Sequence, residues 1–388
     1  MKQLSFFSGP GVLGILGGGQ LGKMLLHAAQ PWDIQTRVLD PDPEAPCKHL
    51  CHYFETGNLM DYDTVYRFGK ACDVLTIEIE HVNTDALKQL KAEGITVHPD
   101  PDALAIIQDK GKQKIFFKHQ GIPTSDFGLY QHAEHVKETV AQGLIRYPFV
   151  QKTRTAGYDG KGVSIIHNEN DLSKLLDGPC IVEDYVPLQG ELAVIAARNE
   201  QGEVVCYEPV WMDFHAEANL LDMLVFPAPV PQHIAAQAEQ YARVLIEAFQ
   251  LCGVLAVEFL LDPNGQLYIN EVAPRPHNSG HQTIESAVTS QYQQHLRGIL
   301  NLPLGSTQVT TPSVMINLLG AAEHTGPVVY KGLNPCLEQA GIHVHLYGKK
   351  ITKPFRKMGH VTVTHADIEQ AKQTAQWVKQ TIRVESHK

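Results

Sequence analysis

Two glutamates flank an expected turn near residue 265. Glu258 and Glu271 lie on either side of the segment Leu-Asp-Pro-Asn-Gly-Gln-Leu at positions 261–267. Asn-Gly between two apolar runs is a strong hairpin signal. With Asn264 and Gly265 as a two-residue turn, residue 261 pairs with 268, 260 with 269 and 258 with 271. The two carboxylates then lie opposite each other on the ladder.

Such an arrangement calls for a cation. Cβ atoms of directly opposed residues are about 5 Å apart, and like charges there destabilise the ladder unless something positive lies between them. The flanking runs 254–261 and 267–272 are otherwise mostly apolar. Oxygen ligands without thiols favour Mg²⁺ or Mn²⁺, which usually accompanies a nucleotide. The alternative is a frayed hairpin with two solvated glutamates.

A glycine-rich segment between two β-type runs has the composition of a phosphate-covering lid. Lys152-Thr-Arg-Thr-Ala-Gly-Tyr-Asp-Gly-Lys-Gly162 carries three glycines and three cations in eleven residues and lacks the Walker spacing. Its backbone N–H groups and Lys152 are suited to a triphosphate, although a flexible hairpin tip has the same composition. Further along, Glu183-Asp-Tyr-Val186 ends a strand and suits an adenine pocket.

The loop after Glu271 presents several polar groups just beyond the two carboxylates. In Pro274-Arg-Pro-His-Asn-Ser-Gly-His281, two prolines restrict the backbone beside one guanidinium, an imidazole, an amide and a hydroxyl. These groups predict a site for a small anion beside a γ-phosphate. A turn-rich connection without function is the alternative.

Two further groups of charged residues are candidates for a substrate site. Five cations fall within positions 349–357 of an otherwise acidic protein, which favours a substrate phosphate or, alternatively, a solvated charge run. Glu78 and Glu80 end a predicted strand and share one face. One of them is placed to orient an amine or a sugar hydroxyl.

The elements that position these residues begin with an open, mostly parallel α/β sheet. Strands are expected at residues 12–16, 36–39, 74–77 and 95–97, followed by one helix over 103–120. Gly17-Gly-Gly-Gln-Leu-Gly22 fits a Rossmann-like turn, with Asp40 18 residues beyond it. The same turn in other α/β domains holds a substrate phosphate. From residue 149 the chain becomes rich in strands, at 149–151, 163–166, 180–185, 192–197 and 204–207, and later at 314–318, 343–347 and 360–364, before a final helix over 368–382.

Composition restricts the class of protein. The chain has 388 residues, 43% hydrophobic, and a formal net charge of −10, which argues against general nucleic-acid or anionic-membrane binding. No run approaches the roughly 18 apolar residues of a membrane helix. Seven dispersed cysteines are typical of a reducing compartment, so we expect a cytoplasmic protein. The segment Cys47-Lys-His-Leu-Cys-His52 resembles part of a zinc site, but no second cluster lies near it in the sequence.

Taken together, these motifs resemble the ATP-grasp superfamily and, within it, the 5-(carboxyamino)imidazole ribonucleotide synthases. The most specific pieces are Gly157-Tyr-Asp-Gly-Lys-Gly162 and Ala273-Pro-Arg-Pro-His-Asn-Ser-Gly-His281. The resemblance implies α/β and α+β architecture, with a Rossmann-like pre-ATP-grasp domain (1–105), an ATP-grasp domain (106–305, lid about 125–190) and a small β-rich C-terminal domain (306–388). It implies that ATP, Mg²⁺ or Mn²⁺ and bicarbonate carboxylate the exocyclic amine of aminoimidazole ribonucleotide through carboxyphosphate, in a homodimer.

The resemblance also assigns roles to individual positions. Arg275, His277 and Asn278, with Lys161, match the catalytic group, and Glu258 and Glu271 the metal ligands. The nucleotide substrate would contact Gln20, Glu80, Tyr158, Asp159, Lys349 and Arg356. The positions that match ATP contacts are Lys110, Lys152, Gly157, Tyr158, Asp159, Gly160, Lys161, Gly162, Val163, Glu183, Asp184, Tyr185, Val186, Glu191, His215, Asn270 and Glu271.

The sequence departs from the family pattern at three positions, and three other classes of protein are alternatives. Lys110, Ala156 and Val163 stand where arginine, glycine and glutamine are common. Lysine keeps the charge but loses the bidentate fork, so weaker ATP affinity is expected. The alternatives are another ATP-grasp ligase, such as a formate-dependent glycinamide ribonucleotide transformylase or a biotin carboxylase, a nicotinamide-dependent oxidoreductase, and a catalytically silent nucleotide-binding module.

Overall fold

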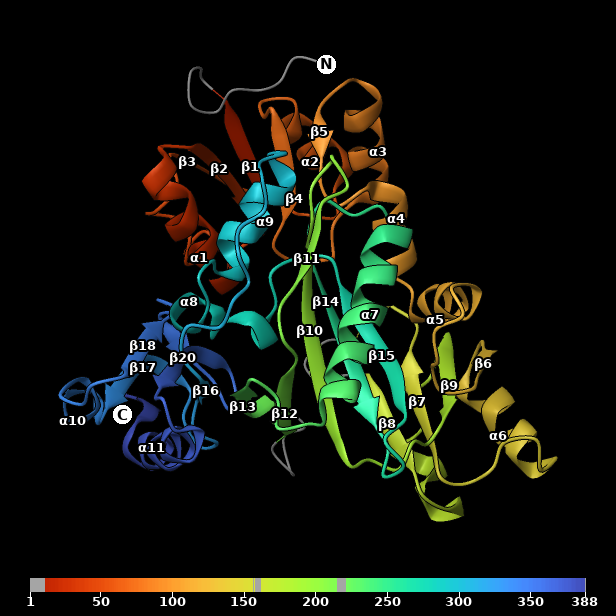
Figure 1. Cartoon of the computed structure of the whole chain (residues 1–388). Coiled ribbons are helices and arrows are strands. Elements are labelled where there is room, and N and C mark those ends of the chain that lie inside the picture. The colour runs from red at the N-terminus through yellow and green to blue at the C-terminus, as the bar shows by residue number, and fades with distance from the viewer. Residues whose placement is uncertain (1–10, 156, 158–161, 215–220, 388) are drawn as a thin grey trace.

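The computed structural model describes residues 11–155, 157, 162–214 and 221–387. Figure 1 shows an N-terminal sheet with its helices, a small sheet formed by the middle of the chain, and a long sheet that continues into the C-terminal strands. This arrangement confirms the predicted combination of α/β and α+β architecture. None of the helices in these ranges is long and apolar enough to cross a membrane.

The N-terminal sheet is parallel and has the strand order β3-β2-β1-β4-β5. Its central strands are buried on both faces because helices cover both sides, as expected for near-continuous apolar runs. The strands expected at 12–16, 36–39 and 74–77 are therefore confirmed. The bounds are β1 Val12–Leu16, α1 Gln20–Ala29, β2 Gln35–Asp40, β3 Tyr53–Thr56, α2 Tyr62–Gly69, β4 Val74–Ile77, α3 Thr84–Ala92 and β5 Thr96–Val97.

The single helix expected over 103–120 is wrong. The chain forms α4 (Pro101–Ile107) and then α5 (Lys110–His119). Asp109 separates them because its carboxylate accepts hydrogen bonds from Gly111 N (2.9 Å) and Lys112 N (3.2 Å) and so caps a new helix. This restart places Lys110 in the first turn of α5.

The small antiparallel sheet has the order β6-β9-β7-β8. Strands β7 and β8 form a hairpin in which Lys152 pairs with Val163, and the glycine-rich segment connects them. The sheet lies beside α5 and α6 in Figure 1. Its bounds are β6 Phe127–Tyr130, α6 Ala133–Ala141, β7 Phe149–Thr153, β8 Val163–Ile166 and β9 Cys180–Asp184.

The long sheet is antiparallel and contains strands on both sides of residue 305. Its order is β15-β14-β10-β12-β13-β16-β20-β18, with β11 beside β10, so the C-terminal strands extend the middle sheet through the β13–β16 pairing. The sequence analysis missed β12 and β13. The strands are β10 Gly190–Arg198, β11 Val204–Cys206, β12 Val210–Phe214, β13 Leu221–Phe226, β14 Gly253–Leu261, β15 Leu267–Ala273, β16 Ser313–Leu319, β18 Ile342–Leu346 and β20 Lys357–Thr364.

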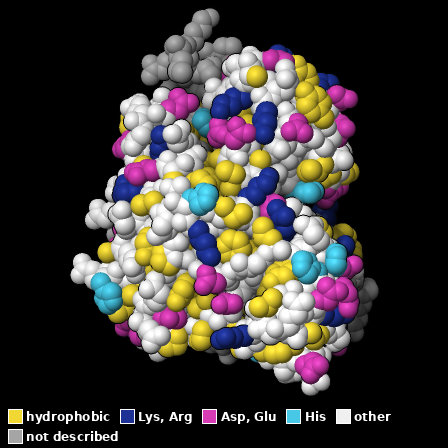
Figure 2. All heavy atoms as spheres, turned by 90° about the vertical axis from the view of Figure 1, so that its right-hand side faces the viewer, with side chains coloured by type: hydrophobic (Ala, Val, Ile, Leu, Met, Phe, Trp, Pro, Cys, Tyr) yellow, Lys and Arg dark blue, Asp and Glu magenta, His cyan; other side chains and the backbone are white. Residues whose placement is uncertain are grey.

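Helices pack on this sheet and connect it to the rest of the chain. Helix α7 (Gln232–Ala248) covers β10 and β14, and α11 (Ile368–Thr381) covers β16 and β20. Helix α9 (Gln291–Ile299) contacts α1 on one side and β14 on the other, and thus lies between the N-terminal domain and the long sheet. On the face shown in Figure 2, basic and acidic side chains are interspersed.

Candidate active site

The hairpin that carries the two glutamates has a different turn from the expected one. Asp262 O accepts a hydrogen bond from Gly265 N (3.0 Å), Asp262 N donates to Gln266 O (3.0 Å), and Gly265 has φ +82°. The loop therefore contains three residues, because Pro263 favours position i+1 of a type I turn and Gly265 the left-handed position after it. Residue 261 pairs with 267 and 260 with 268, so the expected 261–268 and 260–269 pairs are wrong.

A β-bulge nevertheless brings the two carboxylates opposite each other. Glu258 pairs with Glu271, whereas Phe259 pairs with Ile269, so Asn270 is the extra residue on β15. A bulge re-aims side chains locally. Asn270 Oδ1 lies 2.7 Å from Lys152 Nζ, and Glu271 contacts Lys110. The 258–271 pairing is thus confirmed, and the bulge directs two adjacent side chains toward lysines.

The two carboxylates have opposite electrostatic environments. Burial raises the pKa of Glu258, and the charges of Glu271 and Glu191 raise it further. Burial acts in the same direction on Glu271, but the charge and hydrogen bond of Lys110 outweigh it and lower that pKa. Burial also raises the pKa of Glu191, on β10, to about 7. Without a cation, Glu258 is the member of the pair that binds a proton.

This donor set fits a divalent cation that is completed by another molecule. Two opposed carboxylates are the kind of ligands that Mg²⁺ uses together with substrate phosphates. Within the described ranges, no group of three or more His, Cys, Asp or Glu side chains is placed to hold a metal ion. Further oxygens must therefore come from a bound molecule or from outside these ranges. The segment 47–52 likewise forms no such group, and Cys47 is buried beside Gly19.

Two lysines and one glutamate form a buried ion cluster next to the carboxylates. Glu183, at the end of β9, lies 3.1 Å from Lys114 Nζ and 3.2 Å from Lys152 Nζ, and it accepts a hydrogen bond from Ser125 Oγ (2.8 Å). Burial would raise the pKa of Glu183, but Lys152 and Lys114 outweigh it and lower the pKa to about 2. Burial lowers the pKa of Lys114 to about 8. The carboxylate of Glu183 is thus bound by residues of the chain itself, whereas the sequence suggested that this residue contacts adenine.

Lys114 is a site residue that the sequence analysis missed. It lies one helical turn after Lys110 on α5, and its Nζ also donates to Thr124 Oγ1 (2.6 Å) and Ile269 O (3.2 Å). The i, i+4 spacing of two lysines was visible in the sequence. The expected helix over 103–120 also contained this spacing, but the sequence analysis did not use it.

Replacing Glu183 with glutamine is expected to destabilise the protein by about 3 kcal/mol at pH 7, because two buried lysines lose their carboxylate partner. The lowered pKa of Glu183 contributes stability that is complete above its ordinary value of 4.5 and is lost as the pH falls toward about 2. The difference between wild type and Glu183→Gln in urea unfolding should therefore shrink between these pH values. Asp126→Asn, which breaks an exposed ion pair with Lys118, is the control and should change little. A difference that is independent of pH would contradict the assignment.

Several predicted ATP contacts lie along the glycine-rich segment and the strand ends. Gly157, Gly162 and Val163 are partly buried near the β7–β8 connection, and Asp184, Tyr185 and Val186 follow the buried part of β9. Glu191 lies on β10 opposite Leu260 of β14. The remaining predicted contacts in these segments, Tyr158, Asp159, Gly160, Lys161 and His215, lie outside the described residues.

The loop after β15 places its polar side chains against the glutamate pair and the N-terminal domain. Arg275 forms an ion pair with Glu80 (2.8 Å), and His277 Nε2 lies 3.5 Å from Glu258 Oε1. The other ring nitrogen of His277 lies 2.8 Å from Ser279 Oγ. Asn278 Nδ2 is buried and has no hydrogen-bond partner in the described part of the chain. Three of the four predicted catalytic residues thus come together, with one amide donor available.

The glycine turn before α1 encloses a carboxyl group of the chain itself. Glu78 accepts hydrogen bonds from Gly19 N (2.8 Å) and Leu21 N (3.2 Å), and a Cβ on Gly19 would lie 2.4 Å from its carboxylate. Asp40 accepts a hydrogen bond from Gly18 N (2.6 Å). In a dinucleotide site, the glycine turn would bind the pyrophosphate and Asp40 would bind the ribose. Here the turn binds Glu78, and Asp40 binds Gly18 N. These contacts argue against the oxidoreductase alternative. Gln20, the first residue of α1, is partly buried beside this turn.

The C-terminal cations lie in a loop that contacts the N-terminal domain. Lys349 Nζ donates to Lys357 O (2.9 Å), and Arg356 donates to Ile351 O (2.6 Å). Lys23 of α1 donates to Leu346 O (2.9 Å). The positive charge of Lys357 opposes the rise in the pKa of Glu258. The sequence analysis did not select Lys357, because the resemblance assigned only Lys349 and Arg356 among the five neighbouring cations.

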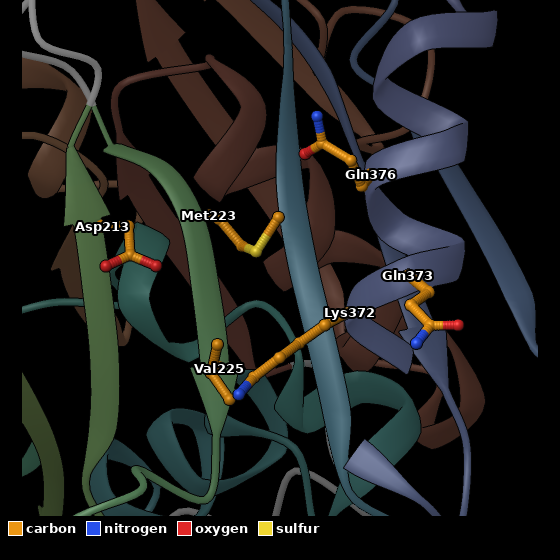
Figure 3. Close-up of a pocket in the computed structure, with 6 residues that line it drawn as sticks. All are labelled: Asp213, Met223, Val225, Lys372, Gln373 and Gln376. Atoms are coloured by element: carbon orange, nitrogen blue, oxygen red, sulfur yellow. The ribbon is translucent and has the colours of Figure 1, made fainter. Parts of the chain in front are cut away.

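A separate groove lies away from these residues. It has a volume of about 550 Å³ between β12, β13 and α11. Figure 3 shows the side chains that line it, Asp213, Met223, Val225, Lys372, Gln373 and Gln376. None of them was a predicted site residue, so we do not assign the site to this groove.

Comparisons with known proteins agree with the arrangement described above. Three family models match: the ribonucleotide synthetase preATP-grasp domain over residues 11–108, the ATP-grasp domain over 115–292, and the phosphoribosylaminoimidazole carboxylase C-terminal domain over 313–374. An N5-carboxyaminoimidazole ribonucleotide synthase from Staphylococcus aureus is 34% identical over 370 residues, covering 93% of this chain and 94% of that protein. A phosphoribosylaminoimidazole carboxylase from Saccharomyces cerevisiae is 36% identical over 94% of this chain, which spans 66% of the yeast protein.

Solved structures extend the similarity to the whole architecture. An N5-carboxyaminoimidazole ribonucleotide synthetase from Thermotoga maritima superposes with a TM-score of 0.89 at 40% identity, covering 97% of this chain and all of that one. An Aspergillus clavatus N5-carboxyaminoimidazole synthase, solved with ADP and 5-aminoimidazole ribonucleotide, has a TM-score of 0.87 at 32% identity, covering 95% and 98%. The ATP-grasp fold expected from the resemblance is confirmed.

Proposed function

The chain belongs to the N5-carboxyaminoimidazole ribonucleotide synthase family, and on that premise we propose how its residues carry out the ATP-dependent carboxylation of 5-aminoimidazole ribonucleotide. It is an ATP-dependent ligase of purine biosynthesis. The observation that carries the proposal is the opposed pair Glu258–Glu271, in which Glu271 contacts Lys110 and Glu258 lies 3.5 Å from His277 of the loop after β15.

The acidic pair and the lysines would bind MgATP. Mg²⁺, held by Glu258 and Glu271, would neutralise charge on the transferred γ-phosphate. Lys110 and Lys152 contact Glu271 and Asn270 in this structure, and both ammonium groups are placed to bind phosphate oxygens beside the metal. The glycine-rich segment 157–162 would cover the triphosphate.

The loop after β15 would bind the one-carbon unit. Bicarbonate attacks the γ-phosphate to give carboxyphosphate and ADP, and the carboxyl group then passes to the exocyclic amine with release of phosphate. Arg275 supplies a planar fork for an oxyanion, and Asn278 supplies an amide donor without a partner in the described ranges. His277 faces Glu258 and is placed to orient the anion between metal and loop.

The aminoimidazole ribonucleotide would lie between this loop and the N-terminal domain. The Arg275–Glu80 pair joins the proposed bicarbonate site to the proposed substrate site, so the amine is expected near Glu80. Gln20, Lys349 and Arg356, with Tyr158, Asp159 and Lys161, would bind the ribose phosphate and the base. We include Lys357 in this group of binding residues, because its charge acts on the pKa of Glu258.

Several broader expectations belong to the same proposal. We propose three domains with boundaries near residues 105 and 305, a homodimer, and a cytoplasmic location without nucleic-acid or membrane partners. Light scattering of the purified chain tests the dimer.

Phosphate release tests the reaction directly. Turnover of MgATP should require both aminoimidazole ribonucleotide and bicarbonate, produce an acid-labile carboxylated product, and stop when EDTA removes the metal. If turnover does not require the ribonucleotide, the chain is another ATP-grasp ligase. Tight binding of NADH would instead support the oxidoreductase alternative.

A further inference from the structure

A buried glutamine holds the backbone of the loop that carries the proposed bicarbonate site. Gln291 is the first residue of α9 and its side chain is fully buried. Its Oε1 accepts a hydrogen bond from His277 N (2.9 Å), and its Nε2 donates to His277 O (2.7 Å). One amide side chain thus satisfies both backbone polar groups of the residue at the centre of the loop.

The clamp is itself held firmly. Gln291 N donates to Thr283 Oγ1 (2.9 Å), and Thr283 Oγ1 donates to Gly280 O (2.6 Å). A Cβ at residue 280 would lie 2.4 Å from Gln291 Oε1, so glycine there leaves room for the amide. Helix α9 begins with a capping box between Ser290 and Gln293, which fixes its first turn.

The backbone position of His277 controls the site. From this backbone, the imidazole lies 3.5 Å from Glu258, and the buried amide Nδ2 of Asn278, the next residue, has no hydrogen-bond partner among the residues that the structure describes. A displacement of about 1 Å in such groups is enough to lower a rate by about a hundredfold. Gln291 itself has no role in the mechanism described above.

We infer that Gln291 is a positioning residue for the carboxylation reaction: through its two hydrogen bonds to His277 it sets the geometry at which the loop accepts bicarbonate. The inference rests on the proposed function of that loop. It predicts that loss of the clamp affects the use of bicarbonate and the transfer of the carboxyl group, and leaves the binding of ATP unchanged.

The same helix offers a matched control. Gln294, one turn further on, is also fully buried, and its amide forms the same two bonds with another residue: Oε1 accepts from Gly305 N (2.9 Å) and Nε2 donates to Gly305 O (2.6 Å). This clamp holds the connection after α9 rather than the site loop. Gln291→Met and Gln294→Met therefore each remove a two-bond backbone clamp from a fully buried position, and Gln291→Met also removes a contact between Nε2 and His281 Nδ1 (3.3 Å). Only Gln291→Met should alter the chemistry.

The experiment compares these variants by steady-state kinetics and thermal unfolding. For Gln291→Met we expect a loss of kcat of about 10- to 50-fold, a raised KM for bicarbonate, an unchanged KM for ATP and less product per phosphate released. Gln294→Met should lose a similar amount in Tm but keep kcat within about twofold. Gln291→Glu keeps the acceptor for His277 N and should recover part of the loss, and it serves as the test variant if Gln291→Met does not fold.

Two results would overturn the inference. One is a folded Gln291→Met, or Gln291→Glu where Gln291→Met does not fold, with wild-type kcat and KM for bicarbonate. The other is an equal loss of kcat in that variant and in Gln294→Met. If instead the wild-type protein and Gln294→Met show no bicarbonate-dependent turnover, the proposed function of the loop fails, and the inference fails with it.

Discussion

Glu271→Gln is expected to reduce carboxylation by about a thousandfold or more while the protein stays folded. The substitution removes one of two opposed metal ligands and leaves Lys110 without the carboxylate that it contacts. The γ-phosphate then loses both its fixed cation and the correct placement of a lysine. Phosphate release in the presence of all three substrates measures the effect, and ADP binding without metal checks that the nucleotide site is intact.

Glu258→Gln tests the metal site without a change in the stability of the protein. Because the pKa of Glu258 is raised, its protonated form dominates the metal-free protein near neutral pH, and glutamine resembles that form. We therefore expect Glu258→Gln to lose activity and to keep its Tm, whereas Glu271→Gln loses both, since a buried lysine is left unpaired. For the same reason, Mg²⁺ binding to the wild type should release a proton from Glu258 and tighten as the pH rises through neutrality. Retained turnover in either variant would remove the metal-site argument.

The elements that are regular in sequence were predictable, and local turn chemistry was not. Periodicity identified the parallel strands of the N-terminal domain because apolar runs there are buried on both faces. It did not identify the break at Asp109, since a helix cap inside a helical pattern needs only one carboxylate. Pro263 changed the hairpin turn in a similar way. Strands β12 and β13 pair with each other through a ladder with a register shift at Asp213–Phe214, and the sequence analysis did not identify them.

The pairing of Glu258 with Glu271 was predicted correctly, but from the wrong hairpin turn. A three-residue loop on a regular ladder would have placed Asn270 opposite Glu258. The bulge restores Glu271 to that position, and it leaves no trace in the sequence apart from two adjacent polar residues on an apolar strand. Long-range contacts such as those of Lys114 and Glu183, and the clamp by Gln291, required the structure, because the partners belong to separate elements.

Arg275→Lys is expected to lower kcat by about 10² to 10³, although the charge is kept. In the structure the guanidinium bonds to Glu80 (2.8 Å) and to Pro276 O (3.0 Å), and its planar fork can hold Glu80 and an oxyanion together. A lysine ammonium is a point charge and cannot reproduce both sets of bonds. The KM for ATP should change little, because Lys110 and Lys152, which we propose bind phosphate, contact Glu271 and Asn270 rather than Arg275. Less of the released phosphate should be coupled to product.

Glu80→Gln and the double variant determine what the ion pair contributes. If Glu80 acts only by holding Arg275, the double variant should be no slower than Arg275→Lys alone, because the two residues are in contact and their effects are not additive. If Glu80 also binds the aminoimidazole ribonucleotide, its replacement should raise the KM for that substrate in both backgrounds. Wild-type kcat in Arg275→Lys would contradict the role of the guanidinium, and the anion would then have to be bound by His277, Asn278 and the metal without it.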